Sequence, residues 1–96
     1  MHIYARQGDL VIEQTDISGE LKEHTKLVLA GRDSAPHVIL GTVLARQEGR
    51  MFFVRVAETT EVTHSERHLP VVLKPGDYII SPLRERGDEA DRAVDD

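Results

Sequence analysis

The sequence predicts a mainly β protein, a small antiparallel barrel or sandwich of about seven or eight short strands with little helix. β-Branched and aromatic residues fall in short runs, and Gly, Pro, Asp and Ser separate these runs at regular spacing. Outside the C-terminal segment, only residues 18–25 have helical potential. That segment is shorter than the ~12 residues that make an isolated helix even marginally stable.

The expected strands follow the turn residues in chain order: 3–5, 9–14, 26–30, 37–45, 51–56, 59–63, 70–73 and 77–81. The segment 37–45 is apolar on both faces, so it is expected to be central, with Gly41 marking a bend or a close backbone approach. Residues 47–50 predict a hairpin turn. Pro75 and Gly76 predict the centre of a type II turn in a closing hairpin, because glycine accepts the positive φ there.

The chain length and its charge distribution predict one β domain over residues 1–86 and an acidic, disordered tail over residues 87–96. A second domain in 96 residues would be too small to bury its own core. The tail holds five acids and one Arg, whereas residues 1–86 hold twelve acids and eleven Lys or Arg. The net charge of −5 therefore belongs mostly to the tail. Its composition offers too little apolar surface to offset the entropy of ordering.

Composition disfavours several classes of protein. A net charge of −5 and four Phe or Tyr residues argue against nucleic-acid binding, which needs clustered Lys and Arg or stacking aromatic rings. No apolar run approaches the ~20 residues that cross a bilayer, and no secretory signal is expected. The chain has no Cys, so it offers neither disulfides nor thiolate metal sites. These features favour a cytoplasmic protein of bacterial or phage origin.

One group of residues has the chemistry of a metal site. His64, Glu66 and His68 are spaced two apart, so an extended segment would direct all three to one side, and His37 begins the longest predicted strand. Imidazole and carboxylate are ligands for divalent transition metals such as zinc, iron, manganese or nickel. The alternative is that residues 64–68 form a polar surface loop with no metal. The segment does not match the His-Glu-x-x-His pattern of zinc proteases.

Three segments resemble a family of short uncharacterised bacterial and phage-borne β proteins. These are the opening Arg6–Ile12, the Thr-His stretch Thr63–Pro70, and the Pro-Gly-x-Tyr segment Val72–Tyr78 with the charged Arg84–Arg86 after it. The likeness runs from about residue 4 to residue 86. It implies a compact β domain and no specific activity. Members often carry Gly-His-x-His near the position of His37, where this chain has Pro36 before the histidine and Ile39 in place of the second one.

Two hypotheses about function remain open. The first is a small accessory or protein-interaction module, associated with a phage or prophage, whose strand edges pair with a partner or a second copy. The shortage of clustered acid–base groups disfavours an enzyme. The second is a small metal-binding β-barrel enzyme or sensor that uses His37, His64, His68 and Glu66. In that case the cofactor is a divalent transition metal.

Overall fold

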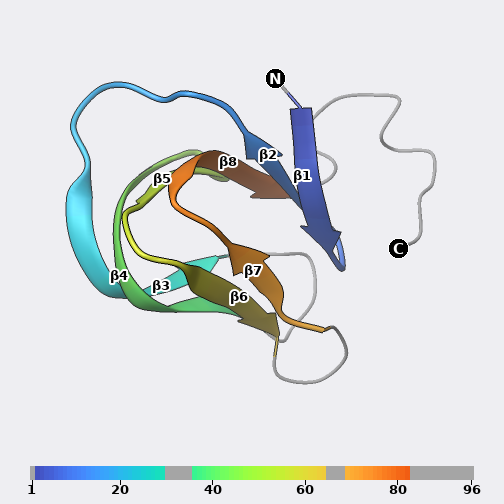
Figure 1. Ribbon diagram of the computed structural model, residues 1–96. Helices are drawn as coiled ribbons and strands as arrows, with labels where there is room; N and C mark the ends of the chain where they lie inside the picture. The colour runs from blue at the N-terminus through green and yellow to red at the C-terminus, as the bar shows by residue number, and fades with distance from the viewer. Residues whose placement is uncertain (1, 30–35, 65–68, 83–96) are drawn as a thin grey trace.

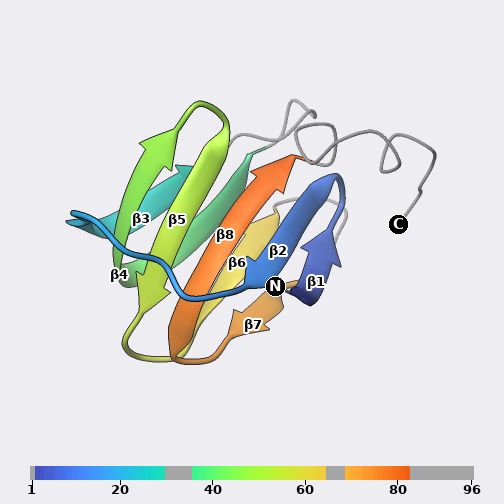
Figure 2. The same cartoon turned by 90° about the horizontal axis from the view of Figure 1, so that it is seen from above.

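The computed structural model describes residues 2–29, 36–64 and 69–82. Within them it has no helix and eight strands: β1 (His2–Gln7), β2 (Leu10–Gln14), β3 (Lys22–Leu29), β4 (His37–Glu48), β5 (Met51–Val56), β6 (Thr60–His64), β7 (Val71–Leu73) and β8 (Gly76–Pro82). All pairings are antiparallel and belong to one sheet, which curls into a nearly closed barrel (Figures 1 and 2). The predicted fold class is confirmed. The predicted tail, residues 87–96, lies outside the described residues.

The strand order around the barrel is β1-β2-β8-β5-β4-β6-β7, and β3 pairs with β4 outside this path. His37 has a partner in both β3 and β6, and Leu44 has a partner in both β3 and β5. Strand β3 therefore lies along the opposite edge of β4 from β5 and β6. Among the described residues β4 is the only strand that pairs with β3, so the sheet ends at β3 on this side.

Strand β4 bends where it changes partner. Its first residues, 37–39, pair with β6, and its last, 44–48, pair with β5. Gly41 lies between these two stretches with φ of 157°, and a Cβ at this position would lie 2.8 Å from Oγ1 of Thr60. The bend needs a residue without a side chain because Thr60 fills that space. Both sequence expectations for Gly41, a bend and a close approach, are met.

The predicted hairpin turn at residues 47–50 is present, since Glu48 pairs with Met51 and Gly49 has φ of 62°. The predicted closing hairpin is wrong. Strand β7 pairs with β6, and β8 pairs with β5 and β2, so β7 and β8 follow one another as a bent strand. Gly76 has φ of 152°, far from the ~80° of a type II turn.

The helical potential of residues 18–25 is also not realised. Residues 18–21 are irregular, and β3 begins at Lys22, four residues before the strand expected from the sequence. Two of the residues in question, Glu23 and Thr25, are exposed. A strand at the edge of a sheet can keep polar side chains in water, so it lacks the apolar alternation that identifies a strand in a sequence.

The barrel encloses one apolar core with contributions from β2 to β8. Tyr78 is fully buried on β8, and the ring of Tyr4 on β1 packs edge-on against it with a centroid distance of 5.1 Å. The hydroxyl of Tyr4 donates a hydrogen bond to the carbonyl of Val72 on β7 at 2.9 Å. This contact joins β1 to β7, the two ends of the strand order.

Candidate functional site

The structure brings His37 and His64 together at one end of the barrel. They are register partners on β4 and β6, and their rings are 4.6 Å apart with an interplanar angle of 62°. Both residues are buried: His37 is fully buried and His64 is 8% exposed. The other two predicted metal ligands, Glu66 and His68, lie outside the described residues.

The side chain of Gln7, at the end of β1, fixes the orientation of His37. The amide nitrogen of Gln7 donates hydrogen bonds to the carbonyls of Val62 at 3.0 Å and Leu69 at 2.8 Å. Its amide oxygen therefore faces Nδ1 of His37, 2.8 Å away. Because an amide oxygen only accepts, Nδ1 must carry the hydrogen, an assignment made from the hydrogen-bond network. This leaves Nε2 of His37 as the nitrogen that can take up a proton or bind a metal.

Asp9 adds a carboxylate to the histidine pair. Its Oδ1 lies 3.7 Å from Nε2 of His37, longer than a hydrogen bond but within ion-pair range. A histidine that binds a metal usually donates its second nitrogen to an oxygen acceptor, which is the relation seen here between His37 and Gln7. Sequence reasoning missed Gln7 and Asp9, because Gln7-Gly8-Asp9 reads as turn chemistry. No spacing signal links these residues to a histidine about 30 positions away.

Among residues 2–29, 36–64 and 69–82, no three His, Cys, Asp or Glu side chains converge closely enough to hold a metal ion. The histidine pair with Asp9 is therefore a polar cluster that does not by itself form a metal site. Metal binding by His37, His64, Glu66 and His68 stays a prediction.

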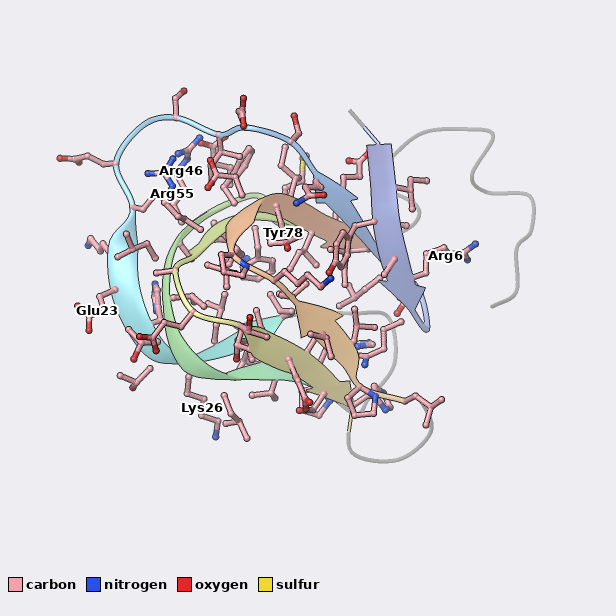
Figure 3. The ribbon with its side chains drawn as sticks, in the orientation of Figure 1. Arg6, Glu23, Lys26, Arg46, Arg55 and Tyr78 are labelled. Atoms are coloured by element: carbon pink, nitrogen blue, oxygen red, sulfur yellow. The ribbon has the colours of Figure 1, made fainter. Side chains whose placement is uncertain are left out.

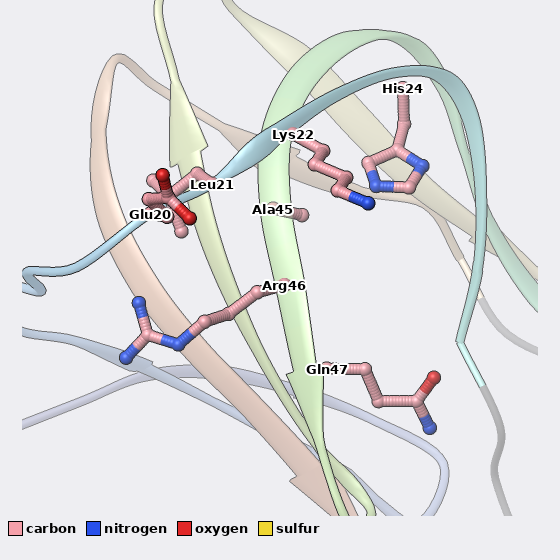
Figure 4. A pocket seen from close by; sticks show the side chains of 7 residues that line it. All are labelled: Glu20, Leu21, Lys22, His24, Ala45, Arg46 and Gln47. Atoms are coloured by element: carbon pink, nitrogen blue, oxygen red, sulfur yellow. The ribbon is translucent and has the colours of Figure 1, made fainter.

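A groove of about 480 Å³ opens where β3 begins beside the end of β4. Figure 4 shows Lys22 and His24 on the β3 side, and Arg46 and Gln47 projecting from β4 in opposite directions. The guanidinium of Arg46 lies 4.4 Å from the centroid of the Phe53 ring and 2.7 Å from Glu48. These contacts partly neutralise and orient Arg46. The groove has Lys22 on the β3 side and Arg46 on the β4 side, and sequence reasoning did not predict it.

Arg46 and Arg55 lie beside the segment that links β2 to β3 (Figure 3), and together with Asp77 they hold it against the sheet. Arg46 donates to the carbonyl of Ser18, and Arg55 donates to the carbonyl of Ile17 at 3.0 Å. Asp77 on β8 accepts from Nε of Arg55 at 2.8 Å and from the amide of Ile17 at 3.1 Å. The hydrogen bond with Arg55 lowers the pKa of Asp77 and raises the pKa of Arg55.

The outer face of β3 and β4 exposes several large apolar side chains. Val28 is 51% exposed, Leu40 63% and Leu44 38%. On the same face, Glu23 and Lys26 point away from the barrel (Figure 3). This apolar face lies beside the outer edge of β3, which pairs with no other strand among the described residues. The backbone edge and the apolar side chains together form a surface, the β3 edge, that could receive another polypeptide strand.

The comparisons with known proteins identify a family but no activity. No curated protein and no solved structure matches the chain. Among the described residues there is no helix long and apolar enough to span a membrane. The model of one family, a domain of unknown function (DUF8820), matches residues 6–82, which include the histidine pair, the groove and the β3 edge. The chain therefore belongs to this family of unknown function.

Proposed function

We propose that the chain is an interaction module that binds an extended polypeptide segment by adding it as a strand to β3. The observation that carries the proposal is the eight-residue length of β3, with one pairing partner among the described residues. A strand edge of this length offers a row of backbone N–H and C=O groups to another chain. Exposed Val28, Leu40 and Leu44 supply apolar contact beside it.

The edge also carries devices that restrict what can pair with it. Lys26 is exposed on β3, and the β3–β4 register shifts between His24 and Lys26. Edge lysines and irregular pairing are known defences against indiscriminate aggregation. They favour a partner strand whose charges complement those on β3, and they disfavour exposed strands that lack such charges.

The variant Thr25→Pro tests strand addition. Thr25 has no Cα partner in the β3–β4 register, so a proline costs less here than elsewhere on β3, while its ring obstructs a new strand. We expect the variant to fold, as judged by circular dichroism, and to lose binding. Deuterium exchange of the chain with a bound polypeptide should show new protection in residues 22–29. Protection elsewhere, with binding unchanged by Thr25→Pro, would overturn the proposal.

A second candidate function is metal binding at the histidine pair, favoured by the orientation that Gln7 gives to His37. The ligands would be Nε2 of His37 and the ring of His64, with Glu66 and His68 as the further ligands predicted from sequence. Chain purified without a polyhistidine tag should then bind zinc or cobalt stoichiometrically in calorimetry. His37→Gln and His64→Gln should abolish this binding, whereas His24→Gln, in the groove, should not. Absence of binding, with melting unchanged by chelator, would exclude this function.

A bacterial or phage origin, association with a phage or prophage, and a cytoplasmic location belong to the same proposal. They are supported by the small size, the absence of cysteine and the resemblance of three segments to short bacterial and phage-borne proteins. A location in an oxidising compartment would contradict the cytoplasmic part. Fractionation of cells that express the untagged chain from its own promoter would test it.

A further inference from the structure

The charges on β3 are arranged so that the strand complements itself. Glu23 is the register partner of Leu44, and Lys26 is the register partner of Leu40. Paired residues in a sheet point to the same side, and both leucines are exposed, so Glu23 and Lys26 share the outer face. The register shift between His24 and Lys26 is what gives two residues three positions apart a common face.

We propose that the polypeptide added to β3 is the β3 strand of a second copy of the chain. The two strands run antiparallel about a two-fold axis between His24 and Thr25. This inference rests on the proposed function and names its partner. In this register Glu23 faces Lys26 of the partner subunit, and the symmetry repeats the pair, so each dimer has two opposite-charge pairs across the new strand boundary. Opposite charges directly across a strand pair stabilise it, and like charges destabilise it.

The neighbouring registers are less favourable. A shift by one residue toward the N-terminus places Lys22 opposite Lys26 of the partner subunit and leaves Glu23 opposite a threonine. A shift by one residue the other way pairs Lys26 with His24 of the partner subunit and Glu23 with a leucine. Charge pairing therefore selects the register centred between His24 and Thr25. A two-fold interface of this kind closes on itself and does not propagate into a fibre.

The side chains on both faces agree with this register. Lys22 and Leu27 would lie opposite each other, and both pair with buried residues of β4, Ala45 and Ile39. They therefore point to the same side of the sheet, as residues directly opposite each other must. On the outer face, Val28 adds exposed apolar surface beside the charge pairs. The two copies join their sheets into one continuous sheet.

Charge reversal tests the partner and the register together. Sedimentation equilibrium of the full chain should show a dimer. Glu23→Lys and Lys26→Glu, each alone, should weaken it at least about tenfold, because each replaces two attractive pairs with two repulsive ones. The double variant Glu23→Lys/Lys26→Glu should restore the dissociation constant to within about threefold of the original. Glu61→Lys, an exposed acid on β6, is the matched control and should leave dimerisation unchanged.

Each result decides a different point. Full restoration in the double variant supports the proposed register, and circular dichroism of each variant separates loss of pairing from loss of folding. A chain that is monomeric at all concentrations overturns self-pairing but not strand addition, which Thr25→Pro and deuterium exchange with a different bound polypeptide still test. A dimer that neither single variant weakens overturns pairing through β3. If Thr25→Pro weakens neither the dimer nor the binding of any other polypeptide, the proposed function is wrong as well.

Discussion

The single side chain of Asp77 connects three parts of the chain. It lies on β8, and its carboxylate accepts hydrogen bonds from Arg55 on β5 and from the amide of Ile17 in the segment between β2 and β3. Its side chain is 16% exposed. Because the carboxylate is mostly shielded from water and satisfied by two kinds of donor, it positions the segment that leads into the β3 edge.

We expect Asp77→Asn to destabilise the fold by about 1–3 kcal/mol at neutral pH, because it removes the charge-assisted bonds and leaves their donors poorly satisfied. The hydrogen bond with Arg55 lowers the folded-state pKa of Asp77 below the 3.8 of an unperturbed aspartate. Its stabilisation is therefore complete above that unfolded-state pKa and is lost as pH falls through the lower folded pKa. Urea denaturation at pH 7 and pH 2.5 should show a smaller difference between variant and parent at the acidic pH. An equal difference at both would contradict this origin.

Tyr78 provides a second test on a single side chain. Burial, with a smaller effect from the neighbouring Tyr4, raises the pKa of Tyr78 to about 12. Its hydroxyl donates to the carbonyl of Lys74 at 2.5 Å, which keeps the neutral phenol bound. A spectrophotometric titration at alkaline pH should contain a transition near pH 12 that Tyr78→Phe removes. Since this pKa is raised on folding, the fold should lose stability as pH rises above ~10, the unfolded-state value. The Tyr78→Phe variant should lose less stability over the same rise in pH.

At the scale of the element, the bend in β4 depends on Gly41. Gly41→Ala would place a methyl group 2.8 Å from Oγ1 of Thr60 and force a side chain into an uncommon backbone conformation. We expect a loss of about 1–3 kcal/mol, the range for overpacking and local backbone strain, measured by urea denaturation. The hydroxyl of Thr60 bonds the carbonyl of Leu40 at 3.3 Å, so Thr60→Ala alone has its own cost.

The double variant Gly41→Ala/Thr60→Ala separates crowding from backbone strain. If crowding dominates, the cost of Gly41→Ala should fall when Thr60 is already alanine, giving a coupling of about 1 kcal/mol in a double-mutant cycle. Full additivity would instead assign the whole loss to the backbone. Gly49→Ala serves as a comparison, because a Cβ at Gly49 meets no atom within 4 Å and φ alone opposes it.

The same elements show what sequence patterns can predict. The apolar run of β4 predicts a central strand, and β4 is paired with β3, β5 and β6. Only one of its two apolar faces is buried, because Leu40 and Leu44 are exposed on the other. The sequence predicts only part of strand β3, because the polar residues Glu23 and Thr25 are exposed and break the alternation of apolar and polar residues. The Pro75-Gly76 pair predicts a hairpin turn that does not form, because turn chemistry alone does not reveal which strands pair across it.

At the scale of the whole molecule, the candidate site illustrates the same limit. The chemistry of histidine predicts that His37 and His64 act together, but only the β4–β6 register places their rings 4.6 Å apart. Gln7 and Asp9 reach the pair from the β1–β2 hairpin, across the barrel opening between β1 and β7. Sequence patterns report local periodicity. They carry no information about which strands become neighbours when a sheet curls.

We expect Gln7 to hold the barrel closed at this opening. Its buried amide joins β1 to the carbonyls of Val62 and Leu69 and accepts the hydrogen of His37 Nδ1. Gln7→Met keeps the length of the side chain but leaves two buried polar groups and one part-buried carbonyl without this partner. We expect a loss of about 2–4 kcal/mol, since each such group costs about 1–3 kcal/mol and some relaxation is possible.

Gln14→Met, on the exposed end of β2, is the matched control and should change stability by less than about 0.5 kcal/mol. Thermal and urea denaturation measure both variants. Deuterium exchange localises the effect, because opening between β1 and β7 should raise exchange in residues 2–7 and 71–73 before the β4–β5 hairpin. Equal losses in the two variants would show that Gln7 does not hold the barrel closed. If protection from exchange falls evenly over all strands, the loss of stability belongs to the core as a whole. If it falls first in β1 and β7, the amide of Gln7 links the histidine pair to closure of the fold.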